Sequence, residues 1–538
     1  MSRIWALILC LPAARAGMVH VTPVTLQPAG LQGLAAPTLA VAPGFSAPLS
    51  GLSFQVPALS APALAMPVPV VQSAPTAAPA APETVRPVAT AWGRLSAPVP
   101  FAAPPAADLN GQKEFADRAF EFKLGAEAAA AGVSAGTSQA SLSDDGGGPA
   151  YPRRPITFNG QTLPSVALRP NIPVEAELIK AIDATKDKIV IAVYEFKSGG
   201  LLEALRRARA RGVDVRIVLD FRNVFPSPAK PGQYQAKRSP EISALLRERF
   251  DVSVLRGLGE YGINHNKFAV FDGRLAEFGS YNWSRFSENN HYENLVFTDE
   301  ADRIADLSGY WTYLRGLSRP VSLASQAEDY SWPEAVPPPP VPSARAKVFN
   351  GVSLPAAVLS PSGLLEDVMV SAIGAARQSV DLAAFAVRST RIAQALAEAG
   401  RRGLRVRVLF DESQSKSEAF QPYARWLTAQ PGVELRLLSG PNHPSDFPPA
   451  EKAHNKFLLL DRRLVMTGSP NQTKYASRGN FENAHLLDDA TDVSAFALFY
   501  EHMFGVARPA LAPAEVPTLP TDAELEAEVT GAPTATDR

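Results

Sequence analysis

Residues 265–272 read HNKFAVFD, and residues 454–461 read HNKFLLLD. Each stretch places a histidine and a lysine two positions apart, ahead of four apolar residues and an aspartate. In an extended strand, residues i and i+2 point to the same face, so the imidazole and the ammonium are expected to project into one pocket. The apolar residues that follow are expected to enter the core.

The two stretches share their downstream neighbours as well. Six residues after each aspartate comes Gly-Ser-x-Asn, at 279–282 and 468–471, and a Glu-Asn pair follows at 293–294 and 482–483. Only seven histidines occur in the chain, and two of them hold equivalent positions with the same spacing to all these partners. This repetition favours a functional site over two unrelated structural histidines.

An internal repeat extends outward from these motifs. Phe-Asn-Gly occurs at 158–160 and at 349–351, and a helical pattern that stops at glycine before a buried β-run occurs at 204–220 and 395–411. We infer that one ancestral domain was duplicated. Each copy reads strand–helix–strand–helix–strand, which predicts an α/β fold with a mixed sheet in each domain.

An imidazole beside a cation suits the cleavage of a phosphodiester. The lysines Lys267 and Lys456 would neutralise phosphate oxygens, and His265 and His454 would attack phosphorus or move a proton. The segment after each glycine would hold developing charge through a hydroxyl and an amide, from Ser280, Asn282, Ser469 and Asn471. A downstream carboxylate, Glu293 or Glu482, would fix the tautomer of an imidazole.

Other polar residues near the motifs carry weaker predictions. Asp272 and Asp461 lie five residues after the lysine, on the opposite strand parity, so we interpret them as structural ion-pair or turn residues. His291 and His485 lie close to the Glu-Asn pairs, and surface or structural roles are favoured for both.

The doubled H-x-K-x4-D-x6-G-S-x-N pattern resembles the signature of the phospholipase D superfamily. The resemblance implies two α/β/α/β/α sandwich domains with mixed sheets and one active site at their pseudo-twofold interface. It also implies that both histidines and both lysines meet one phosphate, with His265 as nucleophile and His454 as general acid. It implies no metal ion and no cofactor.

The substrate is less well defined by the sequence. Net charge is −1, from 52 Lys and Arg against 53 Asp and Glu, and a dedicated nucleic-acid binder usually has a clearer basic excess. We therefore expect a phospholipid-cleaving phosphodiesterase with peripheral membrane contact. The alternatives are a low-specificity endonuclease that binds nucleic acid, favoured by the GSYNWS string at 279–284, a phosphatidyl transferase similar to cardiolipin synthases, and a non-catalytic binding protein.

The chain's organisation follows from composition. Residues 1–16 resemble a cleavable signal peptide, so export is expected, and this segment contains Cys10, the one cysteine of the chain. An Ala/Pro-rich spacer is predicted at 17–150, with a possible helix at 111–133. The predicted domains are 151–330 and 345–510, separated by a Pro-rich linker at 331–344 and followed by a disordered tail at 511–538. A duplicated chain completes its site alone, so a monomer is expected.

Overall fold

The computed structural model describes residues 151–226, 238–441 and 451–530, all within one compact unit. The predicted signal peptide 1–16 and the spacer 17–150, with its possible helix at 111–133, lie outside the described residues. In the described part of the chain, no helix combines the length and the apolar character that a membrane span requires.

The first lobe is built on one mixed sheet. Its strand order is β12-β7-β6-β4-β8-β9-β11, with β3 also paired to β11. The strands are β1 (Pro155–Phe158), β2 (Gln161–Pro164), β3 (Val166–Arg169), β4 (Lys188–Val193), β5 (Phe196–Lys197), β6 (Asp214–Asp220), β7 (Asp251–Leu255), β8 (Lys267–Phe271), β9 (Leu275–Gly279), β10 (Trp283–Ser284), β11 (His291–Thr298) and β12 (Arg319–Pro320). The helices are α2 (Val174–Ala184), α3 (Gly199–Ala210), α4 (Phe221–Val224), α5 (Pro240–Arg247), α6 (Arg285–Asn290), α7 (Ala301–Leu317) and the 3-10 helix η3 (Ala327–Asp329).

The second lobe repeats this plan. Its sheet has the order β15-β24-β22-β21-β16-β18-β19-β25. The strands are β13 (Lys347–Phe349), β14 (Val352–Leu354), β15 (Ala357–Leu359), β16 (Ser379–Ala384), β17 (Val387–Arg388), β18 (Arg405–Asp411), β19 (Val433–Leu438), β20 (Lys452–Ala453), β21 (Lys456–Leu460), β22 (Leu464–Gly468), β23 (Gln472–Thr473), β24 (Asn483–Leu487) and β25 (Arg508–Pro509). The helices are α8 (Leu364–Ala375), α9 (Thr390–Arg401), α10 (Gln421–Thr428), α11 (Lys474–Arg478), α12 (Ala490–Val506), α13 (Asp522–Thr530) and the 3-10 helix η4 (Gln414–Lys416).

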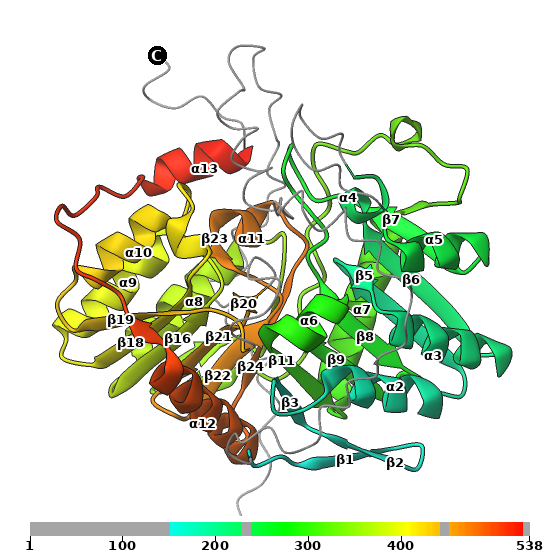
Figure 1. Cartoon of the computed structure of the whole chain (residues 1–538), viewed down its shortest axis with the longest axis horizontal. Helices are drawn as coiled ribbons and strands as arrows, with labels where there is room; N and C mark the ends of the chain where they lie inside the picture. Colours follow the sequence, from blue (N-terminus) through cyan, green and yellow to red (C-terminus); the bar gives the residue numbers. More distant parts are fainter. Residues whose placement is uncertain (1–150, 227–237, 442–450, 531–538) are drawn as a thin grey trace, which may run out of the picture. The chain divides into compact units, whose positions relative to one another are not determined.

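The two sheets correspond strand for strand. In the first lobe β4, β6 and β7 run parallel while β8, β9 and β11 are antiparallel to their neighbours. In the second, β16, β18 and β19 are parallel while β21, β22 and β24 are antiparallel. The predicted α/β class, the mixed sheets and the duplication are confirmed (Figure 1).

The same capping residues begin and end the equivalent helices α3 and α9 in the two lobes. Ser198 and Ser389 cap α3 and α9, and each hydroxyl accepts a hydrogen bond from the backbone N–H three residues later, at 3.0 and 3.1 Å. Gly212 and Gly403 follow these helices with φ of 91° and 84°, a conformation that glycine adopts without steric cost. The glycine stops predicted from the sequence are therefore confirmed.

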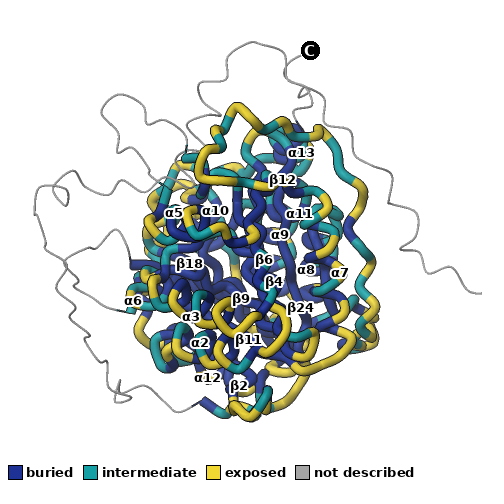
Figure 2. Tube along the Cα trace, turned by 90° about the vertical axis from the view of Figure 1, so that its right-hand side faces the viewer, coloured by how far each residue is buried: buried dark blue, intermediate teal, exposed yellow. Residues whose placement is uncertain are grey.

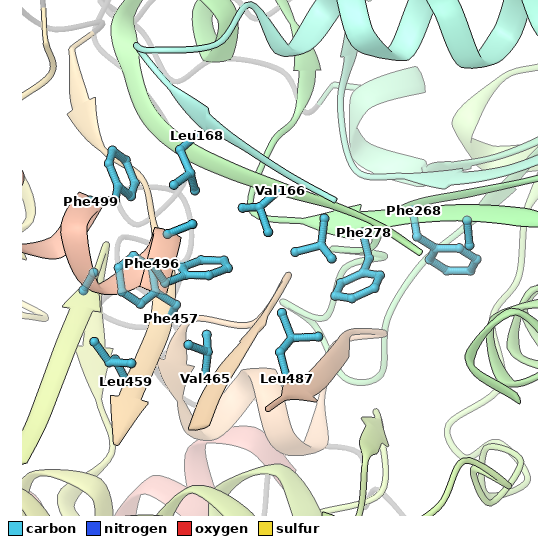
Figure 3. Close-up of a cluster of buried hydrophobic side chains, with 14 of the residues drawn as sticks. Val166, Leu168, Phe268, Phe278, Phe457, Leu459, Val465, Leu487, Phe496 and Phe499 are labelled. Atoms are coloured by element: carbon cyan, nitrogen blue, oxygen red, sulfur yellow. The ribbon is translucent and has the colours of Figure 1, made fainter. Parts of the chain in front are cut away.

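A shared hydrophobic core joins the lobes. It lies between the two sheets and includes Phe268 and Phe278 from the first lobe and Phe457, Phe496 and Phe499 from the second (Figure 3). Helices α7 and α12 contribute to this layer, and the outer faces of the sheets pack against α2 and α3 in one lobe and α8 and α9 in the other. Strands buried on both faces run through the interior (Figure 2).

The chain after the second lobe differs from the predicted tail. Residues 331–344 carry neither helix nor strand, but the expected disordered tail 511–538 contains helix α13. Lys474 of α11 binds Asp522 at 2.6 Å and Glu526 at 3.4 Å, and Leu525 and Val529 are buried. Partners on the folded lobe order this acidic segment, which composition alone could not reveal.

Candidate active site

The two H-x-K motifs lie at equivalent strand starts in the two lobes. Lys267 and Lys456 are the first residues of β8 and β21, and each histidine lies two positions earlier. His265 and His454 are buried, with 3% and 6% of their surface exposed. The ammonium of each lysine donates to the carbonyl of its own histidine at 2.7 Å, and Nζ of Lys456 also lies 3.0 Å from Nε2 of His454.

The carboxylate that holds each imidazole comes from the opposite lobe. Nδ1 of His265 lies 2.9 Å from Glu482, and Nδ1 of His454 lies 2.8 Å from Glu293. Glu293 and Glu482 each hold an imidazole, and in both cases it is the histidine of the other copy. Strand pairing explains the exchange, because β11 of the first lobe runs parallel to β20 of the second, immediately before His454. The two lobes thus form one site.

The serines of the Gly-Ser-x-Asn segments position these carboxylates. Ser280 donates to Glu293 at 2.5 Å, and Ser469 donates to Glu482 at 2.6 Å. The predicted role of the hydroxyls, holding charge on the phosphate, is therefore replaced by orientation of the glutamates. The preceding glycines permit this, because a Cβ at Gly279 would collide with the carbonyl oxygen of Asn294 on β11.

Asn282 and Asn471 retain the features expected of groups that contact substrate. Both are buried, and among the described residues neither side-chain oxygen has a hydrogen-bond partner. Buried amides are ordinarily paired, so an unpaired amide oxygen beside a catalytic segment is suited to meet a donor brought by substrate or water.

Two further asparagine pairs tie the lobes together. Asn294 donates to Asn455 at 2.8 Å, and Asn483 donates to Asn266 at 2.8 Å. Asn266 and Asn455 occupy the middle position of H-x-K, and we did not predict a role for them. The recurrence of His-Asn-Lys and Glu-Asn in both copies is the sequence signal that could have identified these asparagines.

Asp272 and Asp461 lie away from the histidines. Asp272 accepts hydrogen bonds from the backbone N–H groups of residues 186–188 and from Asn159. Asp461 does the same for residues 377–379 and for Asn350. These contacts are those of a turn anchor, and they explain why the Phe-Asn-Gly triplet recurs in both copies.

His291 and His485 have different surroundings. His485 lies in the core between the lobes, 4.1 Å from the ring of Phe278, which is a structural position. His291 is 7% exposed, and Nδ1 of its ring lies 3.4 Å from Glu293. A surface role for His291 is therefore excluded, and this histidine belongs to the site.

The family is decided by comparison with known proteins. The family model described as "Cardiolipin synthase, PLD-like domain" matches the chain twice, at residues 178–312 and 369–504. The chain belongs to the phospholipase D superfamily.

Individual relatives match shorter parts of the chain. A phospholipase D of Rickettsia bellii is 28% identical over 29% of this chain and 70% of its own length. The mitochondrial cardiolipin hydrolase of Homo sapiens is 30% identical over 25% of this chain and 49% of its own length. Nuc, a phospholipase D family member from Salmonella typhimurium of known crystal structure, is 27% identical, with 29% of this chain and 97% of Nuc covered and a TM-score of 0.26. The family and the relatives' names support a phosphodiesterase-type enzyme.

Burial determines the protonation states of the histidines and lysines in the active site. It lowers the pKa of His265 to about 4 and that of Lys267 to about 8. Burial also lowers the pKa values of His454 and Lys456 well below their ordinary range. Burial works to raise the pKa of Glu293, but His454, His291 and Lys456 outweigh it and hold that pKa below its ordinary value. Neutral imidazoles that donate Nδ1–H to carboxylates are therefore favoured, with Nε2 left for chemistry.

One group of side chains in the site has the character of a metal-ligand set. Three side chains each offer one ligand atom, and these atoms all lie within 4.8 Å of one another: His291, Glu293 and His454. No metal was predicted, because no cluster of carboxylates or cysteines occurs along the sequence. The cluster arises when β11 brings two ligands against the third from the other lobe.

Proposed function

We propose that this chain is a metal-independent phosphodiesterase of the phospholipase D type, which removes phospholipid head groups through a covalent phosphohistidine. The observation that carries the proposal is the crossed pairing of His265 with Glu482 and of His454 with Glu293. Each pair fixes one imidazole nitrogen and leaves Nε2 for reaction, as nucleophilic and general acid–base catalysis require.

The surroundings of the two Nε2 atoms differ and support a division of roles. Nζ of Lys456 lies 3.0 Å from Nε2 of His454, and this ammonium must turn to the phosphate before that nitrogen can carry the proton of a general acid. Among the contacts of the described residues, Nε2 of His265 has no such cation against it. We therefore assign His265 as the nucleophile and His454 as the general acid.

The reaction then proceeds in two balanced steps. In the first, Nε2 of His265 forms a bond to phosphorus, the bond from phosphorus to the head-group oxygen breaks, and the proton on Nε2 of His454 passes to that oxygen. In the second, His454 takes a proton from water, the water oxygen bonds to phosphorus, and the phosphorus–nitrogen bond breaks. Lys267 and Lys456 offset the negative charge of the phosphate oxygens in both steps. The anionic phosphate also favours the protonated form of His454 before the first step.

A phospholipid substrate fits the chain better than nucleic acid. Net charge is −1, so the whole chain supplies no strong positive field for a polyanion. The names of the relatives, phospholipase D and cardiolipin hydrolase, point in the same direction. An endonuclease of the same superfamily is the competing function.

The deciding experiment is turnover by the full chain in EDTA, with phosphatidylcholine vesicles and plasmid DNA as parallel substrates. The variants His265→Ala and His454→Ala are measured beside the wild type. Lipid cleavage that either variant abolishes supports the proposal. DNA cleavage with intact lipid reverses the substrate assignment, and activity that vanishes in EDTA and returns with a divalent cation overturns the metal-independent mechanism.

A further inference from the structure

A three-ligand cluster is built across the junction of the two lobes. In the parallel pairing of β11 with β20, His291 lies opposite Lys452 and Tyr292 lies opposite Ala453. Continuing this register by one residue brings Glu293 beside His454, in agreement with their 2.8 Å contact. His291 and Glu293 are two positions apart on one strand, so they present their side chains on the same face.

The geometry of the cluster fits a tetrahedral transition metal. Nδ1 of His291 and Nδ1 of His454 lie 3.4 and 2.8 Å from the same oxygen of Glu293. Zinc takes histidine nitrogen and carboxylate oxygen at about 2.0–2.2 Å, so a bound ion requires the closer pair to separate by about half an ångström. Three protein ligands would leave the fourth position for water. All three residues are buried, which reduces competition from bulk solvent.

The other half of the site lacks this cluster. At the position equivalent to His291 the second lobe has Asn480, whose amide donates to Glu482 at 3.0 Å and whose oxygen accepts from the backbone of Ile263. An amide held in this way is a poor ligand for zinc. Among the described residues, the glutamate–histidine pair therefore has a third metal-binding partner in one copy, the pair of Glu293 with His454.

We propose that His291, Glu293 and His454 form a binding site for a divalent transition metal, with zinc as the occupant, and that occupancy inhibits the enzyme reversibly. A bound ion takes up the Glu293 oxygen and Nδ1 of His454, which are the two atoms whose hydrogen bond orients the general acid. The inhibitory part of this proposal rests on the proposed function, whereas the binding part stands on the geometry alone.

Neighbouring charges favour a weak and exchangeable site over a permanent one. Lys456 lies 3.0 Å from the far nitrogen of His454, and Lys452 is the residue opposite His291 in the strand pairing. Both cations repel a metal ion, and Glu293 is the carboxylate that offsets them within the cluster. We therefore expect added zinc to inhibit the enzyme and a chelator to reverse this inhibition.

Cobalt(II) provides a direct readout, because its tetrahedral complexes absorb visible light strongly whereas the octahedral aqua ion absorbs weakly. The full chain, freed of metal with EDTA and dialysed, is titrated with cobalt and then with zinc. We expect a visible band that rises hyperbolically with added cobalt, fits one site per chain and disappears when zinc is added. His291→Asn, which copies the residue of the other lobe, and Glu293→Gln should abolish the band, while Glu482→Gln, the same change in the other half, should retain it.

Activity is measured separately from binding. Zinc should inhibit the wild type, and the concentration that halves activity should rise by more than about tenfold in His291→Asn, the ratio that corresponds to about 1.4 kcal/mol. A one-site band that His291→Asn abolishes supports the site even in a chain that cleaves no diester. The metal site is overturned if cobalt produces no band, or if the band persists in both His291→Asn and Glu293→Gln. If the chain still cleaves diesters in either case, the proposed function stands.

Discussion

Glu482 of the second lobe holds Nδ1 of His265 of the first at 2.9 Å, and Glu293 holds His454 in the reciprocal pair at 2.8 Å. The imidazole of each H-x-K motif takes its carboxylate from the other lobe. Docking of the lobes therefore assembles the catalytic groups, and the shared core around Phe268 and Phe457 is what maintains that docking.

The crossed pairs predict that the two glutamates affect different steps. Glu482→Gln should lower kcat by about 10–100-fold with a smaller change in KM, because its amide supports His265 without the negative charge. Glu293→Gln should lower it similarly for an alkoxide leaving group, which needs a proton from His454. A p-nitrophenolate leaving group needs no proton, so with such a diester a pre-steady-state burst should remain in Glu293→Gln and slow in Glu482→Gln. A burst that slows equally in both variants would contradict the assignment of His265 as nucleophile.

The turn aspartates predict a loss of stability without a loss of chemistry. Asp272→Ala removes the acceptor for the backbone N–H groups of residues 186–188, and Asp461→Ala does the same for 377–379. Each change should lower the free energy of unfolding by about 1–3 kcal/mol, because three backbone N–H groups lose a charged acceptor at the turn. Denaturant titration measures this value. Folded Asp272→Ala at low temperature should keep a kcat within about threefold of wild type, and a larger loss would place Asp272 in the chemistry.

Much of the fold could be predicted from internal repetition. The matching β-runs and the glycine stops at Gly212 and Gly403 predicted the paired sheets, because local pattern and capping chemistry determine those elements. The H-x-K spacing likewise predicted that each lysine shares a face with its histidine.

The partners of those side chains could not be predicted in the same way. Glu293 has the same spacing to His265 as Glu482 has to His454, but this spacing does not indicate which histidine each glutamate contacts. The actual contact joins residues 161 positions apart and depends on the docking of β11 against β20. The serine role depends on the close approach of strand β11 to Gly279, which no local pattern encodes.

Buried histidine predicts acid sensitivity of the fold. Burial, reinforced by Arg303, lowers the pKa of His485 well below 6.5, and neither ring nitrogen has a hydrogen-bond partner among the described residues. Below pH 6.5 the unfolded chain takes up a proton at this imidazole while the folded chain does not, so the free energy of unfolding falls as the pH is lowered. His485→Leu should reduce the difference in unfolding free energy between pH 7.5 and pH 5.5. His502→Asn, at a half-buried position, should change that difference less, and an equal effect of the two substitutions would contradict the prediction.

Helix α13 predicts a stabilising role for the C-terminal segment. Lys474 is 3% exposed and binds Glu366 of α8 and Asp522 of α13, while Val529 packs against Leu258 of the first lobe. Ending the chain at residue 510 should lower the free energy of unfolding by at least about 2 kcal/mol, because buried Leu525 and Val529 are lost together with two carboxylates.

In the full chain, the double variant Asp522→Asn and Glu526→Gln tests the ion pairs alone. The loss of unfolding free energy that it causes should be smaller in high salt, to the extent that the pairs are exposed. Glu515→Gln, an exposed change in the same segment, should alter stability by less than about 0.5 kcal/mol. Equal Tm values for the full and shortened chains would show that α13 does not contribute to the folded lobes.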